Sequence, residues 1–323
     1  MKFKDVYYLP SGRIFLLETE DNFVIECTEM RDVSVDGKEH FEVRNSLDPK
    51  VIWKHLKPYN DKWLLTVSTQ KGCPHKCEFC DVAPLGFHGN LSQIEILEQI
   101  EFILESTPYV KHTSKAKIGF ARMGEPAHNI DNVIGAMKSL YCFNKNIKWL
   151  PCFNSILPRR TLLNESGFDV IDKIIDLKEN YFNGFLHFQL SINSTNEEQR
   201  KELFGGAEII SIEEIINYIN KKDIHNRTIT LNFIVMEDIE LDIDKLVKFG
   251  LNKNKFVVKL IPLNNTERGI INNLKTFANY ENYDDLILIG NKFKKAGIPV
   301  VVDSIAKCEE AGLCCGQLVQ NLK

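Results

Sequence analysis

Cys73-Pro74-His75-Lys76-Cys77-Glu78-Phe79-Cys80 carries the strongest structural signal in this chain. It places three thiols on one short loop with the spacing C-x3-C-x2-C. Clusters of the [4Fe–4S] type are normally held by four cysteine thiolates, one on each iron. A loop with three cysteines therefore predicts a [4Fe–4S] cluster in which one iron stays open for an outside ligand.

An open iron of this kind can bind the amino and carboxylate groups of S-adenosylmethionine (SAM), which is then cleaved reductively to a 5′-deoxyadenosyl radical. Two plainer interpretations of the three thiols are a zinc site and buried structural cysteines. Zinc knuckles use two C-x2-C pairs, and no second pair or C-x2-H follows Cys80 at a suitable spacing. Buried structural cysteines are not expected on a polar loop that contains Pro74 and Lys76. We therefore favour the radical chemistry.

Composition and charge describe an ordinary globular protein of 323 residues, of which 44% are hydrophobic and 26% charged. This apolar content is enough for a sizeable core and excludes a wholly disordered chain. The net charge of −4 provides no strong basic field and disfavours broad nucleic-acid binding. No apolar run reaches membrane-spanning length, and the first residues lack a signal-peptide pattern. Nine cysteines, an odd number, fit a reducing compartment, so we expect a cytoplasmic protein.

Strand and helix signals divide the chain into three regions. Residues 1–60 carry short β-rich runs and predict a small antiparallel sheet. Residues 61–303 alternate between strands and helices, which predicts an α/β fold whose parallel sheet, curved or closed, has the active site at the strand carboxyl ends. Residues 304–323 form a C-terminal tail expected at that site. Ser92 and Glu95 have capping-box spacing. Strands are expected at 64–68, 117–121, 147–153, 184–191, 228–235, 255–261 and 299–303, and helices at 92–104, 129–140, 209–219 and 284–295.

Further motifs follow in a fixed order. They are Val67-Ser68-Thr69-Gln70-Lys71-Gly72-Cys73 with Gly86-Phe87-His88-Gly89-Asn90-Leu91, Met123-Gly124-Glu125-Pro126 with Asn129-Ile130-Asp131-Asn132-Val133, Gln189-Leu190-Ser191-Ile192-Asn193, Leu260-Ile261-Pro262-Leu263-Asn264 and Cys314-Cys315-Gly316-Gln317-Leu318. Together they resemble the radical SAM superfamily and, within it, the RlmN/Cfr family, which methylates adenine in RNA. The resemblance covers roughly residues 64–318 and implies a partial (β/α)6 barrel, a [4Fe–4S] cluster, SAM, and an electron donor such as flavodoxin or ferredoxin.

The same resemblance implies roles for individual residues. The cluster ligands are Cys73, Cys77 and Cys80, and the SAM-binding residues are Phe79, Gly124, Glu125, Cys152, Ser191, Asn193 and Asn264. The carboxylate of Glu125 suits the ammonium group of SAM, and Gly124 allows the backbone to come close. For Ser191, Asn193 and Asn264 the alternative is polar capping at strand ends. Cys315 matches the cysteine that carries the methyl group in the family.

Several positions depart from the family pattern. The second reactive cysteine of the methylases, which resolves a crosslink to RNA, falls on Thr66, and a hydroxyl cannot form a disulfide bond. The catalytic glutamate of the family falls on Trp53, and the serine that contacts SAM falls on Cys152. Arg122 replaces a glycine and places a cation near the pocket. Residues 1–60 are too short and too β-rich for the helical RNA-binding domain of the family.

These departures lead us to expect a radical SAM lyase that breaks a C–N bond of a small, base-like molecule and does not act on RNA. The most similar relative is then queuine lyase, an enzyme of queuosine salvage in anaerobes, with queuine as the substrate. The expected catalytic residues are Asp81 and Cys315, and the expected substrate contacts are Asp81, Arg122, Asn154, Cys314 and Gln317.

Two other functions stay open: an RlmN-like RNA adenine methyltransferase with altered cysteine usage, and an iron–sulfur protein without catalysis. Cys308, Cys314 and Cys315 could ligate a second cluster, although C-x5-C-C is an unusual spacing. Cys27 and Cys142 are expected to be buried as small hydrophobic residues.

Overall fold

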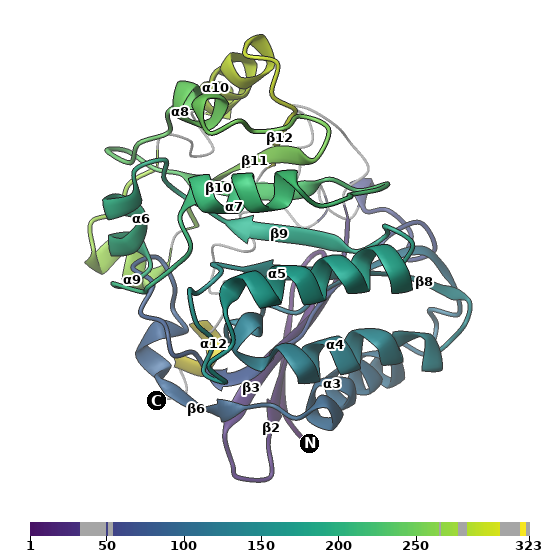
Figure 1. The fold of residues 1–323 in the computed structure, drawn as a ribbon. Helices are drawn as coiled ribbons and strands as arrows, with labels where there is room; N and C mark the ends of the chain where they lie inside the picture. The colour runs from purple at the N-terminus through teal and green to yellow at the C-terminus, as the bar shows by residue number, and fades with distance from the viewer. Residues whose placement is uncertain (33–49, 51–53, 265, 277–282, 304–316, 321–323) are drawn as a thin grey trace. The chain divides into compact units, whose positions relative to one another are not determined.

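A computed structural model describes residues 1–32, 50, 54–264, 266–276, 283–303 and 317–320. The backbone forms two compact units, coloured by residue number in Figure 1. The first unit comprises Met1–Pro74, Asp81–Phe153 and Ala306–Lys323. The second comprises His75–Cys80 and Asn154–Ile305, so the cysteine loop contributes residues to both units. In the described part of the chain, no helix is long and apolar enough to cross a membrane.

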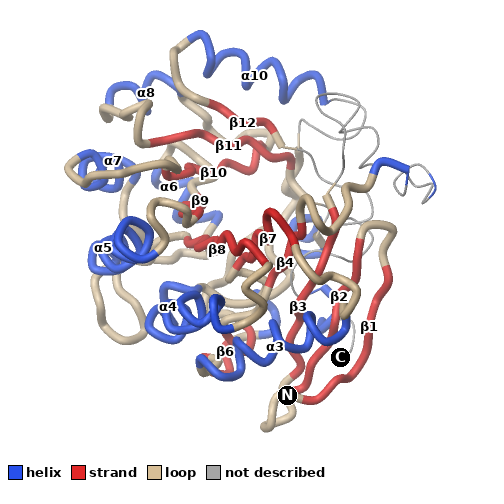
Figure 2. The backbone as a smooth tube through the Cα atoms, turned by 90° about the vertical axis from the view of Figure 1, so that its right-hand side faces the viewer, coloured by secondary structure: helices blue, strands red, loops and turns tan. Residues whose placement is uncertain are grey.

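The first unit begins with the predicted antiparallel sheet. Its strands β1 (Lys2–Tyr8), β2 (Gly12–Glu18) and β3 (Val24–Arg31) run side by side, as Figure 2 shows. Ile14–Leu17 of β2 are almost completely buried, which anchors the sheet. β3 continues antiparallel to β4 (Trp63–Thr66), with Thr28 opposite Thr66. The N-terminal strands are therefore an extension of the sheet that holds the first parallel strand.

In the first unit this sheet continues through three parallel strands: β4, β7 (Thr113–Gly119) and β8 (Ile147–Ser155). The last two residues of β8 belong to the second unit. The connecting helices α3 (Gln93–Ser106) and α4 (Ile130–Ser139) lie side by side in Figure 1. The predicted capping box of α3 is present, because the Ser92 hydroxyl accepts from Glu95 N and the Glu95 carboxylate accepts from Ser92 N. The shorter elements are β5 (Gln70–Gly72), η1 (Ala83–Leu85), β6 (Phe87–Asn90), η2 (Pro126–Asn129), η3 (Leu140–Cys142) and α12 (Gln317–Gln320).

The second unit is built on four parallel strands: β9 (His187–Ser191), β10 (Ile229–Val235), β11 (Phe256–Pro262) and β12 (Val300–Val302). Its longest helix, α10 (Tyr283–Lys295), lies along β11 and β12 in Figure 2. The remaining helices are α5 (Gly167–Asp176), η4 (Leu177–Tyr181), α6 (Glu197–Leu203), α7 (Ile212–Asn220), α8 (Ile243–Lys248) and α9 (Glu267–Ile271). The predicted α/β class, with parallel strands and an N-terminal antiparallel region, is confirmed.

The two faces of the parallel strands in the second unit differ in polarity. Since side chains alternate along a strand, Leu231, Phe233 and Val235 share one face of β10, and all three are buried. The opposite face carries polar residues that are only half-buried, including Gln189 on β9 and Asn232 on β10. This polar face leads to the strand carboxyl ends, where α/β sheets place their ligand sites.

Candidate cluster and cofactor site

The entry to the cysteine loop depends on a glycine. Gly72 has a φ of +72°, and a Cβ atom at this position would lie 1.8 Å from the carbonyl oxygen of Gly86. The same carbonyl accepts a hydrogen bond from Cys73 N at 2.8 Å. Because only glycine tolerates both the left-handed backbone and this close approach, residue 72 fixes how the first cysteine leaves β5.

The second half of the loop is held through its backbone in the second unit. Arg268 donates to the carbonyl oxygens of residues 76 and 77, Asn272 donates to that of residue 78, and Thr266 to that of residue 79. These distances lie between 2.8 and 3.2 Å. Four successive carbonyls are thus bound by α9 and its flanks, which fixes the backbone between Cys77 and Cys80.

The three loop cysteines are present as thiols; Cys77 is buried, and Cys73 and Cys80 are half-buried. Among the described residues, no three His, Cys, Asp or Glu side chains converge where one metal ion could sit. A four-iron cluster takes one thiolate per iron. Burial lowers the pKa of His75 in this loop to about 4. Three thiols on one loop fit a [4Fe–4S] cluster that takes one thiolate on each of three irons.

Gly124 and Glu125 form a turn after β7 that is packed against β5. Gly124 has a φ of +96°, and a Cβ there would lie 2.5 Å from Cβ of Gln70. Oε1 of Gln70 accepts from Glu125 N at 2.8 Å, and its Nε2 donates to Asn90 Oδ1 at 2.6 Å. Glu125 is buried and accepts from Ala127 N at 3.0 Å. Gln70, which the sequence analysis did not identify as a site residue, therefore holds this turn in place.

Asn129 is a second polar residue that the sequence analysis passed over. It is almost fully buried, and its Nδ2 donates to the carbonyl oxygens of Thr69 and Leu91, both at 2.7 Å. Its Oδ1 accepts from Asn132 Nδ2 at 2.8 Å. One side-chain amide thus connects the residues flanking the β5–β6 hairpin to the start of α4.

Four asparagines of the second unit have a buried amide atom without a hydrogen-bond partner among the described residues. One is Asn220, at the end of α7, and the other three lie on or just after parallel strands. Their atoms are Nδ2 of Asn193, Oδ1 of Asn232 and Oδ1 of Asn264. Asn193 has a φ of +64°, and its Oδ1 accepts from Ile234 N at 3.1 Å. Buried polar atoms are normally satisfied, so these positions suit a ligand that offers both donors and acceptors, as the nucleoside and amino acid of SAM do. Ser191 lies opposite Asn232 in the strand register.

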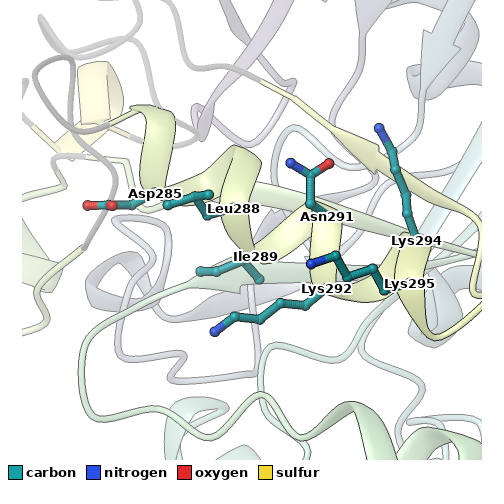
Figure 3. Close-up of a pocket in the computed structure, with 7 residues that line it drawn as sticks. All are labelled: Asp285, Leu288, Ile289, Asn291, Lys292, Lys294 and Lys295. Atoms are coloured by element: carbon teal, nitrogen blue, oxygen red, sulfur yellow. The ribbon is translucent and has the colours of Figure 1, made fainter.

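Two pockets in the second unit are of interest. One, of about 230 Å³, is lined by Asn193 and mainly by apolar residues such as Phe233 and Met236. The other, of about 670 Å³, follows α10, and Figure 3 shows that its lysines point in different directions. Its described lining is Asp285, Leu288, Ile289, Asn291, Lys292, Lys294 and Lys295. Lysines in the last turn of a helix stabilise its carboxyl end, so this charge needs no ligand to explain it.

The expected substrate residues have varied surroundings. Arg122 is almost fully buried and forms an ion pair with Glu26, with Nη2 and Oε2 2.6 Å apart. Oδ1 of Asn154 accepts from Gln189 Nε2. Asp81 is buried. Cys314, Cys315 and the side chain of Gln317 lie outside the described residues, as do Cys308 and Trp53.

The remaining expected cofactor residues and cysteines are placed as follows. The ring of Phe79 meets Phe204 edge-on, with centroids 6.0 Å apart. Cys152 is buried in β8. Cys27 is buried, as predicted, and burial raises the pKa of its thiol. Cys142, in contrast, is exposed. The prediction that it is buried is wrong, because η3 places it at the surface after α4.

Comparison with known proteins gives consistent relationships. Residues 67–250 match the family model of the radical SAM superfamily. The chain is 32% identical over 264 residues to a probable dual-specificity RNA methyltransferase RlmN of Pseudothermotoga lettingae, covering 79% of this chain and 68% of that protein. It is 29% identical over 298 residues to the dual-specificity RNA methyltransferase RlmN of Desulfosudis oleivorans, covering 90% and 73%. A radical SAM methyltransferase from Sphaerobacter thermophilus has a similar fold, with a TM-score of 0.67 and 17% identity over 98% of this chain and 80% of that chain.

These relationships confirm the resemblance to an RlmN-like core and the [4Fe–4S] cluster and SAM as cofactors. They also correct two expectations. The expected queuine lyase with a small-molecule substrate is wrong, because these relatives are RNA methyltransferases by name. The expectation that RNA is not a partner is wrong for the same reason. It relied mainly on Thr66 and on the lack of the helical RNA-binding domain in residues 1–60. The structure shows that the side chains of Thr66 and Arg122 are both bound by residues of β3.

Proposed function

The chain belongs to the radical SAM superfamily, with an RlmN-like core, and we propose that it is a radical SAM methyltransferase that acts on adenine in RNA. The observation that carries this proposal is the 32% identity over 264 residues to a probable RNA methyltransferase. The turn at Gly124 supports SAM binding, because Gln70 fixes it through a hydrogen bond from Glu125 N and the buried carboxylate of Glu125 suits an ammonium group.

In this proposal Cys73, Cys77 and Cys80 hold the [4Fe–4S] cluster. The hydrogen bonds to the backbone carbonyls of the loop keep the thiol groups in place. When bound, the cluster supplies the electron that cleaves SAM. Gly124 and Glu125 receive the methionine end of SAM, where a buried carboxylate suits an ammonium group. Ser191, Asn193 and Asn264 receive the rest of the cofactor, and Asn193 and Asn264 supply one donor and one acceptor that the described residues leave unused.

The use of cysteine differs from that of the family. The hydroxyl of Thr66 is 2.7 Å from that of Thr28 and has no capacity to form a disulfide. Cys27, the next residue on β3, is fully buried with a raised pKa, and a protonated thiol is a poor nucleophile. We therefore propose that Cys315 carries the methyl group and that product release does not use a thiol at residue 66.

The chemistry of the cysteine loop also favours one cellular compartment. Thiolate ligands and a reducible cluster persist in a reducing compartment, so we propose the cytoplasm. RNA is present there as well, which agrees with the proposed substrate.

The test is methyl transfer from SAM labelled with deuterium in its methyl group. Anaerobically reconstituted protein, SAM, dithionite and unmodified ribosomal or transfer RNA transcripts are incubated together, and digested nucleosides are analysed by mass spectrometry. We expect deuterium-labelled methyladenosine with the parent protein and none with Cys73→Ala. Formation of 5′-deoxyadenosine without label in any nucleoside would contradict the methyltransferase and leave the radical chemistry standing.

A further inference from the structure

One buried carboxylate in the first unit joins two segments that are far apart in the sequence. Glu26, on β3, is completely buried. Its Oε2 lies 2.6 Å from Nη2 of Arg122, and its Oε1 accepts from Val319 N at 3.2 Å. Both oxygens are therefore engaged, one by the residue before the Met123–Glu125 turn and one by α12.

The strand register places this carboxylate at the carboxyl end of the parallel strands. Thr28 of β3 is opposite Thr66, the last residue of β4, so Glu26 lies beyond that end. Two hydrogen bonds confirm the position, because Ser68 Oγ donates to the Glu26 carbonyl at 2.6 Å and Arg122 N donates to the Val67 carbonyl at 3.1 Å. This is the edge at which α/β barrels assemble their active sites.

A buried ion pair is poor evidence for stability as such, because desolvation cancels much of the attraction. A buried ion pair matters more where it fixes one arrangement of segments that are far apart in the sequence. Here the arrangement includes the turn proposed to receive SAM, since Met123 O accepts from Thr69 N at 2.9 Å directly beside Arg122. It also includes α12, where Leu318 and Val319 are buried.

We infer that Glu26 is a positioning residue of the active site, whose carboxylate fixes Arg122 with the Met123–Glu125 turn and holds α12 against β3. The N-terminal sheet then supports the cofactor site directly. This inference concerns the SAM-binding turn and the tail, and it stands whether RNA or another molecule receives the methyl group.

The same strand offers a matched control. Glu29 is also buried, forms an ion pair with Arg13 at 2.7 Å and accepts from Trp63 Nε1 at 3.1 Å. Trp63 is the first residue of β4, so this pair lies toward the opposite end of the strand. Glu29→Gln removes a comparable buried charge at a distance from the proposed site.

The experiment compares Glu26→Gln and Glu29→Gln in the reconstituted 323-residue protein. Hydrogen exchange by mass spectrometry follows residues 122–125 and 317–320, and 5′-deoxyadenosine formation gives KM and kcat for SAM. We expect Glu26→Gln to speed exchange in both segments about tenfold and to raise KM about tenfold, the effect of losing a hydrogen bond to a charged group. Glu29→Gln leaves both readouts at parent values although it also lowers Tm. Equal behaviour of the two variants would overturn the inference.

A double variant keeps the test decisive if Glu26→Gln does not fold. Glu26→Met with Arg122→Met removes both charges together, which is often tolerated in a buried pair. It also removes the acceptor for Val319 N. We expect residues 317–320 to exchange faster than in the parent, and parent-like protection of that segment would show that Glu26 does not hold the tail.

Discussion

Gly124→Ala is the sharpest test of the geometry proposed for the SAM-binding turn. An added Cβ would lie 2.5, 2.6 and 2.9 Å from Cβ, Cγ and Oε1 of Gln70. At these separations Gln70 has to move, and its hydrogen bond from Glu125 N at 2.8 Å is lost. The substitution therefore disturbs the turn without adding or removing a charge.

Two contributions make up the unfolding free energy that Gly124→Ala is expected to lose. Placing a residue with a Cβ at a φ of +96° lowers the unfolding free energy by about 1–2 kcal/mol, because the left-handed backbone is strained. Overpacking against Gln70 adds about 1–3 kcal/mol. Gly206→Ala isolates the first contribution, since Gly206 has a φ of +79° and a Cβ there would meet no atom within 4 Å.

Thermal unfolding of both variants measures their unfolding free energy, and calorimetry with SAM measures their affinity for SAM. We expect Gly124→Ala to lose about 1–3 kcal/mol more unfolding free energy than Gly206→Ala, which is the overpacking contribution alone. SAM affinity falls at least about tenfold in Gly124→Ala, as for a lost hydrogen bond to a charged group, and stays at the parent value in Gly206→Ala. Equal destabilisation of the two variants with unchanged SAM affinity would refute the close approach of Gly124 to Gln70.

Three further predictions address the cluster, the hairpin and a surface ion pair. Cys73→Ala should abolish iron–sulfur absorbance and SAM cleavage, whereas the exposed Cys142→Ala should retain both; a full cluster in Cys73→Ala contradicts the ligand assignment. Asn129→Ala removes the side-chain donor to two carbonyls, of which that of Thr69 keeps the hydrogen bond from Leu91 N, and should cost about 1–3 kcal/mol in denaturant unfolding; a loss below about 0.5 kcal/mol, the range of ordinary surface substitutions, contradicts its role. The hydrogen bond from Arg159 lowers the pKa of Glu214 to about 2 from an ordinary 4.5, so its stabilisation is present above pH 4.5 and is lost as the pH falls toward 2. Because the pair is exposed, Glu214→Gln should cost at most about 1 kcal/mol at pH 7 and nothing near pH 2, and an equal cost at both pH values contradicts the assignment.

The regular elements could be predicted closely from the sequence. The helix expected at 92–104 is α3 (Gln93–Ser106), and the strand expected at 255–261 is β11 (Phe256–Pro262). Both are defined by local signals, namely a capping box and an apolar run, which need no knowledge of distant residues. The cysteine loop and the Gly124 turn are equally local.

The polar supports of the site could not be found in this way. Gln70 and Asn129 look like ordinary polar residues in the sequence, and only the fold shows that their amides are buried and fully used. Arg122 looks like a cation available to a substrate, and the fold instead places it against Glu26. Such pairings join residues between 20 and 96 positions apart, and a single sequence contains no signal for them.

Strand β3 brings the departures from the family pattern together. Thr66 stands where the methylases have a cysteine, and its hydroxyl is bound by Thr28. Arg122 stands where they have a glycine, and its guanidinium is bound by Glu26. Both partners lie on the N-terminal sheet, which itself differs from the helical domain of the family. The changes therefore form one connected alteration at the edge where β3 meets β4.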